Sequence, residues 1–155
     1  MAKRITKVTT KKGEDELNSW IGLLTSLKEL EDQKEFLLSV QNRLFDIGGI
    51  LTTKSDIPLK AGYLKDLEYQ TNNMNKELPH LENFVLPGGK PESSVIHIAR
   101  TVCRRAERTL INADTNEAVE KSCLVYLNRL SDFLFVLARK VNLDSSIEEL
   151  LWSQD

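Results

Sequence analysis

The chain has 155 residues, of which 28% are charged and 41% hydrophobic, and its formal net charge is −2. This length fits a single domain, residues 1–155, that is large enough to bury a core. The small net charge provides no general attraction to nucleic acid or to an anionic membrane, so we expect neither as a partner. No apolar run approaches the roughly 20 residues of a membrane span, and we expect no signal peptide after Met1.

Apolar residues at helical spacing predict five helices and no strand. Their apolar stripes cover residues 17–27, 37–51, 64–78, 95–110 and 117–141. Pro79 ends the third helix, and Pro91 fits the first turn of the fourth. The fifth is apolar almost all round and should therefore be central. A short amphipathic segment at residues 147–152 is expected to dock on the bundle, so the prediction is an all-α five-helix bundle.

The two cysteines, Cys103 and Cys123, are too few for a disulfide framework. Both lie on helical patterns among apolar neighbours. We expect them to be small buried residues of a protein in the reducing cytoplasm.

The segment of residues 99–108 (ARTVCRRAER) places four arginines and one glutamate on the fourth helix. Arg100, Arg104 and Glu107 stand at i, i+4 and i+7, which aligns them along one line of the helix. Two guanidinium groups on a rigid helix beside a carboxylate suit a polyphosphate ligand. A solvated charged face is the alternative. The apolar stripe of the same helix comprises Val95, Ile98, Ala99, Val102, Cys103, Ala106 and Leu110.

The predicted central helix also contains polar residues, namely Asn128, Asp132 and Arg139. Asn128 and Asp132 are one turn apart and face the same way. Because buried polar groups must be paired, these residues either form an interhelical hydrogen-bond network or line a site.

Four further motifs flank the arginine helix, and all occur in a fixed order. They are residues 15–22 (DELNSWIG), 41–48 (QNRLFDIG), 83–89 (NFVLPGG) and 126–139 (YLNRLSDFLFVLAR). Together they resemble the PduO-type ATP:cob(I)alamin adenosyltransferases over residues 10–142. The resemblance implies a ferritin-like five-helix bundle that assembles as a homotrimer with active sites between subunits.

The activity that the resemblance implies is attack by the cobalt of cob(I)alamin on the 5′ carbon of ATP, with release of triphosphate. Cobalt is the nucleophile, so the protein need not supply one. Magnesium would arrive with the phosphates, without dedicated protein ligands. His80 and His97 need no catalytic role; His97 could border the site, but we expect an ordinary surface or capping histidine. On the fourth and fifth helices, the residues implied for catalysis and ATP binding are Arg100, Arg104, Glu107 and Asn128.

Phe84 precedes Leu-Pro-Gly-Gly, where the family places an aromatic residue at the cobalamin side of the site. There it helps to exclude the lower axial ligand of cobalt, which makes cob(II)alamin easier to reduce. From the sequence itself, Phe84 could equally anchor a loop against the bundle. Asp15 is implied to pair with Arg100 across a subunit contact, although an aspartate in a first helical turn is also favourable through the helix dipole.

The N-terminal region departs from the family pattern. Thr10, Lys11 and Gly13 match the start of a loop that wraps the ATP phosphates, but Glu14 and Asp15 follow at once, where the family has roughly twenty more residues. Either this protein has lost the segment, which would call ATP binding into question, or further residues separate Gly13 from Glu14. We expect the second, with the two Cα atoms farther apart than the 3.8 Å of neighbouring residues.

Three functions follow as hypotheses. The first is a working adenosyltransferase, with a cobalamin reductase or an adenosylcobalamin-dependent enzyme as a further partner. The second is a noncatalytic relative that binds cobalamin, and the third is a helical scaffold whose charged helix only mediates contacts.

Overall fold

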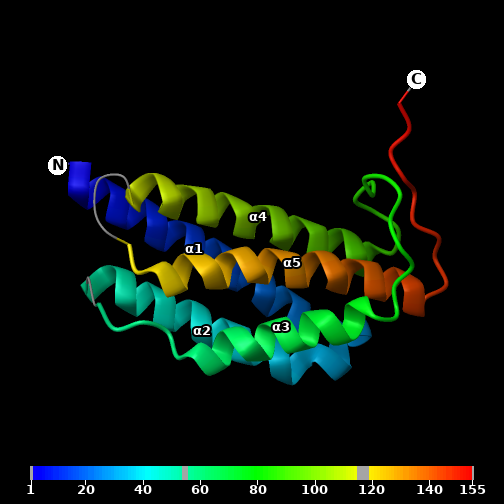
Figure 1. Cartoon of the computed structure of the whole chain (residues 1–155), viewed down its shortest axis with the longest axis horizontal. Coiled ribbons are helices and arrows are strands. Elements are labelled where there is room, and N and C mark those ends of the chain that lie inside the picture. The colour runs from blue at the N-terminus through cyan, green and yellow to red at the C-terminus, as the bar shows by residue number, and fades with distance from the viewer. Residues whose placement is uncertain (1, 54–55, 115–118, 155) are drawn as a thin grey trace.

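Five α-helices form a bundle in the computed structural model, which describes residues 2–53, 56–114 and 119–154 (Figure 1). They are α1 (Ala2–Ser26), α2 (Lys34–Thr53), α3 (Ala61–Asn75), α4 (Pro91–Asp114) and α5 (Lys121–Asp144), with a short 3-10 helix η1 (Lys28–Gln33) between α1 and α2. Within these ranges there is no strand, only an isolated bridge between Val85 and Leu151. The predicted all-α five-helix bundle is confirmed.

Helix α5 is the central element, as its apolar sequence predicts. It lies between α4 and α3 (Figure 1), and its buried residues include Leu127 and Phe133, both with no exposed surface. Burial of each such side chain contributes about 1.5–3 kcal/mol relative to exposure. Because α5 is fixed on two sides, polar residues at its margins are held rigidly against α4 and α3.

The helices extend beyond several of the predicted ranges, most of all α1, which begins at Ala2 instead of residue 17, and the boundaries of α5 and α3 have local causes. α5 begins at Lys121 instead of residue 117 and continues to Asp144; residues 117 and 118 lie outside the described part of the chain. Its start is set by Glu120, whose Oε2 accepts a hydrogen bond at 2.6 Å from the backbone N–H of Ser122 and so caps the helix. Helix α3 ends at Asn75, before Pro79. The backbone N–H of Lys76 still donates to the carbonyl of Asn72 at i−4, whereas residues 77 and 78 tighten into i to i−3 hydrogen bonds.

Helix α1 runs through Gly13 and Glu14 without interruption, so the two are neighbours in one helix. The prediction that further chain separates them is therefore wrong, and residues 10–13 are helical instead of forming a loop. Gly13 faces α4, where an added Cβ would lie 3.6 Å from Cβ of Ala106. Continuous backbone hydrogen bonds and this packing offset the cost of about 1 kcal/mol that glycine carries inside a helix.

The C-terminal segment pairs mainly with the loop before α4 and also contacts the bundle at α5. The backbone N–H of Leu86 donates to the carbonyl of Leu150, and that of Trp152 donates to the carbonyl of Phe84, each at 2.8 Å. Outside a helix, the backbone N–H and C=O groups of this segment need such partners. Two contacts join the segment to α5: the backbone N–H of Ile147 donates to the carbonyl of Asn142 at 2.9 Å, and Oε1 of Glu149 lies 2.9 Å from Nε of Arg139.

None of the described helices combines the length and the apolar character that crossing a membrane requires.

Candidate functional site

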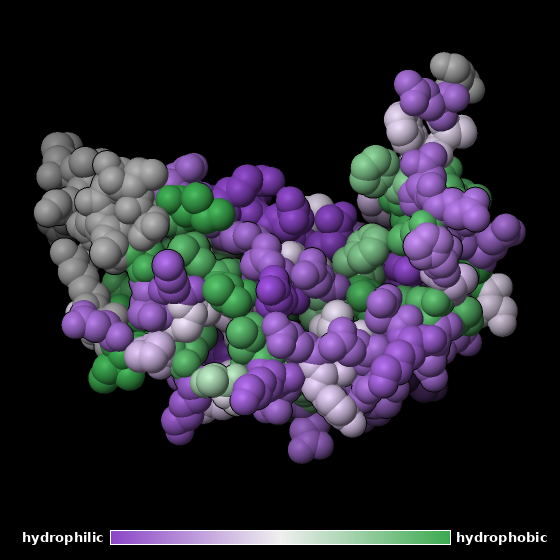
Figure 2. Space-filling model, viewed as in Figure 1, coloured by the Kyte–Doolittle hydropathy of each residue, from purple (hydrophilic) through white to green (hydrophobic). Residues whose placement is uncertain are grey.

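The predicted line of charged residues lies along the edge of α4. The apolar stripe of this helix is buried at Ala99, Cys103 and Ala106, which turns the opposite edge outward. Arg104 is exposed there, while Arg100 and Glu107 are half-buried. Strongly hydrophilic residues accordingly gather over α4 at the upper edge of Figure 2. The two guanidinium groups therefore stand on consecutive turns of a rigid helix.

A chain of hydrogen bonds connects α4, α5 and α3 beside these arginines. Nδ2 of Asn128 donates to Oε1 of Glu107 at 3.1 Å, and Nη1 of Arg129 donates to Oδ1 of Asn128 at 2.7 Å. Nε of Arg129 in turn donates to Oε1 of Glu68 at 3.2 Å. Asn128 thus belongs to the interhelical network that the sequence left as one alternative, and it lies next to the arginine line. Glu68 and Arg129 are members that the sequence analysis did not identify.

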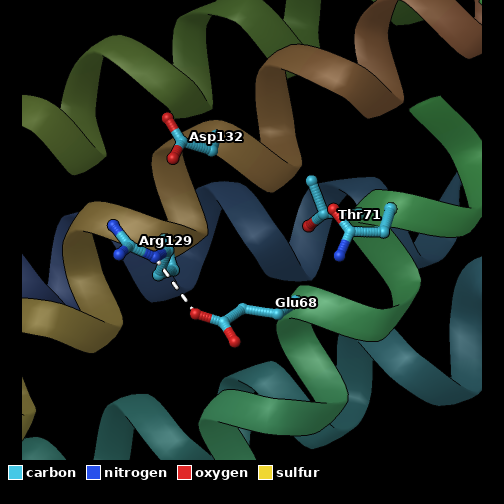
Figure 3. A pocket seen from close by; sticks show the side chains of 5 residues that line it. Glu68, Thr71, Arg129 and Asp132 are labelled. Carbon is cyan, nitrogen blue, oxygen red and sulfur yellow. Dashed lines mark hydrogen bonds and ion pairs between the residues drawn. The ribbon is translucent and has the colours of Figure 1, made fainter.

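A polar cavity of about 280 Å³ opens at the α3 end of this network. The cavity is lined by Glu68 and Thr71 of α3 and by Arg129 and Asp132 of α5, and Figure 3 shows the Glu68–Arg129 ion pair between the two helices. Asp132 is exposed and lines this cavity, which is the second alternative that the sequence left open. The reason is that α3 and α4 cover two sides of α5 and leave the side of Asp132 open.

Arg100 is held from two sides. Its Nε donates to Nδ1 of His97 at 3.3 Å, and its Cζ lies 6.0 Å from the ring centroid of Phe135 in α5. Burial, followed by the positive charge of Arg104, lowers the pKa of Arg100. His97 is only 3% exposed, so the expectation of a surface or capping histidine is wrong: its position on the inner side of α4 places it against Phe135.

Phe84 lies in the loop before α4 and is 76% exposed. Its ring centroid is 6.2 Å from that of Trp152 in the C-terminal segment, and hydrophobic residues are visible at this end of the molecule in Figure 2. A side chain so exposed does not anchor the loop against the bundle. It is available to an apolar ligand.

The loop is fixed instead by Asn142, a residue that the sequence analysis missed because the fifth helix was expected to end at residue 141. Asn142 is buried; its Oδ1 accepts from the backbone N–H of Lys90 at 2.9 Å, and its Nδ2 donates to the carbonyl of Gly88 at 3.0 Å. Gly89 has φ +96°, and a Cβ there would lie 2.5 Å from Oδ1 of Asn142. Gly89 is thus required both by its conformation and by its close approach to α5.

The N-terminal residues implied by the resemblance are only partly brought to this site. Asp15 is exposed on α1, and its neighbour Glu16 pairs with Arg105 of α4. Gly13 packs beside Ala106, one residue from Glu107. Thr10 and Lys11 belong to α1, but their side chains lie outside the described part of the structure.

Neither cysteine has the character of a nucleophile. Cys103 and Cys123 are free and buried, as predicted. Burial raises the pKa of both thiols, that of Cys123 to about 12. No group of three or more His, Cys, Asp or Glu residues in the described ranges could hold a metal ion.

The family model described as cobalamin adenosyltransferase matches residues 3–141. A cobalamin adenosyltransferase of Cupriavidus metallidurans is 45% identical over 142 residues, which cover 91% of this chain and 77% of that protein. A corrinoid adenosyltransferase of Bacillus subtilis is 43% identical over 145 residues, covering 88% of this chain and 74% of that protein.

Solved structures agree with these relatives. A variant PduO-type ATP:corrinoid adenosyltransferase from Lactobacillus reuteri, complexed with cobalamin and ATP, gives a TM-score of 0.88 at 31% identity. The superposition covers 95% of this chain and 83% of that one. The sequence matches and the shared fold extend over most of the chain, so it belongs to the cobalamin adenosyltransferase family.

Proposed function

We propose that this protein transfers the 5′-deoxyadenosyl group of ATP to cob(I)alamin, giving adenosylcobalamin and triphosphate. The observation that carries the proposal is the hydrogen bond between Asn128 and Glu107, which joins two residues of separate family motifs beside Arg100 and Arg104. Membership of the family supports it, as does the superposition on a relative complexed with cobalamin and ATP.

The reaction places specific demands on the chain. The bond between cobalt and the 5′ carbon forms with the electron pair of cob(I)alamin, while the bond from that carbon to the phosphate oxygen breaks and triphosphate leaves with its electrons. The protein must align the ribose and stabilise the charge on the leaving group. We assign the charge stabilisation to Arg100 and Arg104, and the orientation of the nucleotide to Glu107 and Asn128, whose amide can both donate and accept.

Magnesium enters this proposal with the phosphates of ATP. It would take its ligands from phosphate oxygens and water, as Mg²⁺ commonly does. Glu107 is the carboxylate in line with Arg100 and Arg104 on α4, and its Oε1 already accepts from Asn128. We therefore assign no dedicated protein ligand to the ion.

The cobalamin side of the site is assigned to Phe84. Its exposed ring and its position ahead of α4 suit contact with the corrinoid, where it would exclude the lower axial ligand of cobalt. Thr10, Lys11 and Gly13 are proposed to contact the ATP phosphates. That role would require residues 10–13, which lie within α1, to leave their helical conformation.

The assembly proposed is a homotrimer in which Asp15 of one subunit pairs with Arg100 of another. A cobalamin reductase or an adenosylcobalamin-dependent enzyme is the proposed protein partner. The proposal extends to a cytoplasmic location, where the free thiols of Cys103 and Cys123 stay reduced.

One observation favours a second candidate, a relative that binds cobalamin without turnover. The uninterrupted course of α1 through Gly13 leaves no room there for the longer phosphate-wrapping loop of the family. An anaerobic assay with ATP and chemically reduced cobalamin separates the candidates: the proposed enzyme forms light-sensitive adenosylcobalamin, whereas tight cobalamin binding without this product would favour the second. If the protein binds neither substrate, the third hypothesis, a helical scaffold, is favoured.

A further inference from the structure

His97, Arg100 and Phe135 form a cluster on the inner side of α4. The guanidinium Nε of Arg100 donates to Nδ1 of His97 at 3.3 Å. The His97 ring meets the ring of Phe135 edge-on, with centroids 6.2 Å apart, and the guanidinium lies 6.0 Å from the same ring. His97 is buried, whereas Arg100 is half-buried and reaches the edge of α4. The cluster therefore connects the packed interior to the arginine line.

The hydrogen bond fixes the chemical state of His97. Nδ1 can accept from a guanidinium only in the neutral imidazole whose proton is on Nε2. Burial, and secondarily the charge of Arg100, lowers the pKa of His97 to about 4. The ring is therefore neutral near pH 7, and no second positive charge opposes Arg100.

This arrangement also limits how Arg100 can bind an anion. A guanidinium can meet two oxygens either through its two Nη groups or side-on through Nε and one Nη. Since Nε donates to His97, the side-on mode is occupied. Packing beside Phe135 reduces rotation of the same group, so less side-chain entropy is lost when an oxyanion binds.

We propose that His97 is a positioning residue that fixes the guanidinium of Arg100, so that only the two Nη groups are presented to an oxyanion on α4. The inference rests on the proposed function, because the oxyanion that matters for turnover belongs to the site of ATP. It assigns to this chain a functional histidine that does not touch the substrate and transfers no proton.

The test compares two substitutions that differ in one acceptor atom. In His97→Asn, Oδ1 lies near the place of Nδ1 and can accept from Arg100, whereas His97→Phe fills the space without an acceptor. We expect kcat/KM for ATP to stay within about threefold of wild type in the first variant. The second should lose about tenfold or more, as for loss of one hydrogen bond to a charged group. His80→Phe, which replaces the exposed histidine, is the control and should retain wild-type kinetics.

A double substitution separates positioning from packing. Arg100→Lys removes Nε, so adding His97→Phe to it should cause no further loss, and the two effects should be strongly non-additive. Equal losses in His97→Asn and His97→Phe, or additive losses with Arg100→Lys, would overturn the proposal.

A spectroscopic measurement on the wild-type protein tests the same bond without reference to turnover. Long-range ¹H–¹⁵N spectra at pH 7 should show His97 as the neutral Nε2–H tautomer, and Arg100→Lys should shift its Nδ1 resonance. An Nδ1–H tautomer, or a resonance insensitive to Arg100→Lys, would contradict the inference. Absence of adenosylcobalamin formation by the wild type would instead contradict the proposed function, and the spectrum would still decide the His97–Arg100 bond.

Discussion

Asn128 uses both ends of its side-chain amide: Nδ2 donates to Glu107 at 3.1 Å, and Oδ1 accepts from Arg129 at 2.7 Å. These two bonds fix the orientation of the amide between α4 and α5. A carboxylate with the same shape would keep the bond from Arg129 but would place a second negative oxygen against Glu107. Replacing Asn128 with aspartate therefore tests whether the bond to Glu107 is needed for turnover.

Asn128→Asp should lower kcat/KM for ATP by at least about tenfold and destabilise the fold by about 1–3 kcal/mol, because a donor is replaced by an acceptor that repels its partner. Steady-state kinetics and urea denaturation measure the two effects. Asn73→Asp, on an exposed position of α3, is the matched control and should change neither. Wild-type kinetics in Asn128→Asp would remove Asn128 from the nucleotide site.

Arg104→Ala and Glu107→Ala should each strongly reduce turnover while the helical content stays intact. Loss of a group that stabilises charge developing on the leaving triphosphate costs roughly 2–4 kcal/mol of transition-state stabilisation. Arg104 is exposed, so its removal leaves little unfilled space. Circular dichroism and turnover are measured together, with Lys65→Ala on α3 as an exposed basic control. Near-normal turnover in both site variants would exclude this edge of α4 as the nucleotide site.

Phe84→Ala should leave ATP binding nearly unchanged and impair the cobalamin half of the reaction. The loss should be greatest when the assay starts from cob(II)alamin, because exclusion of the lower ligand matters at the reduction step. Tyr69→Ala removes another exposed aromatic side chain and serves as the control. Equal losses from cob(II)alamin and from prereduced cob(I)alamin would mean that Phe84 acts only through the structure of its loop.

Asp15 and Arg100 should be coupled if they pair across subunits. Each alanine variant should lose activity, and the double variant should lose much less than the sum of the two effects. Light scattering on the wild type should report a trimer at working concentrations. Additive effects, or a monomer that turns over normally, would contradict the shared site.

The stability of the protein should depend on pH through His97. Its pKa falls from 6.5 to about 4 on folding, first because of burial and then because of Arg100. The folded state therefore binds fewer protons than the unfolded state between these values, and the stabilisation present above pH 6.5 is lost as the pH falls toward 4, by at most about 3 kcal/mol.

Urea denaturation of wild type and His97→Asn between pH 4 and pH 7 measures this contribution. The advantage of the wild type over the variant should shrink steadily below pH 6.5. Stability curves that run parallel over the whole range would show that His97 does not titrate with a lowered pKa.

The five helices, and the alignment of Arg100 with Arg104 and Glu107, could be predicted because both depend on spacing within one segment. The partners of those residues could not, because the bonds from Asn128 to Glu107 and from Arg129 to Glu68 join segments 21 and 61 residues apart. Sequence periodicity contains no information on which faces of two helices meet. The burial of His97 escaped prediction for the same reason.

The irregular parts were the least predictable. The C-terminal segment lacks a period that would reveal its pairing with Phe84 and Leu86, which depends on backbone groups present in every residue. At Gly13 the family resemblance suggested a loop, whereas helical hydrogen bonding continues through the glycine in this chain. A resemblance transfers a pattern of side chains more safely than the conformation of a segment whose length differs.

The central claim is that the 5′ carbon of ATP becomes bonded to cobalt, and isotopic labelling of that carbon tests it most directly. Anaerobic incubation of the wild-type protein with cob(I)alamin and ATP carrying ¹³C at the 5′ position should place the label in a carbon bonded to cobalt and release triphosphate in equal amount. Arg104→Ala should slow both products together. Hydrolysis of ATP without a labelled cobalt–carbon bond, or cobalamin binding with no reaction, would contradict the assignment as an adenosyltransferase.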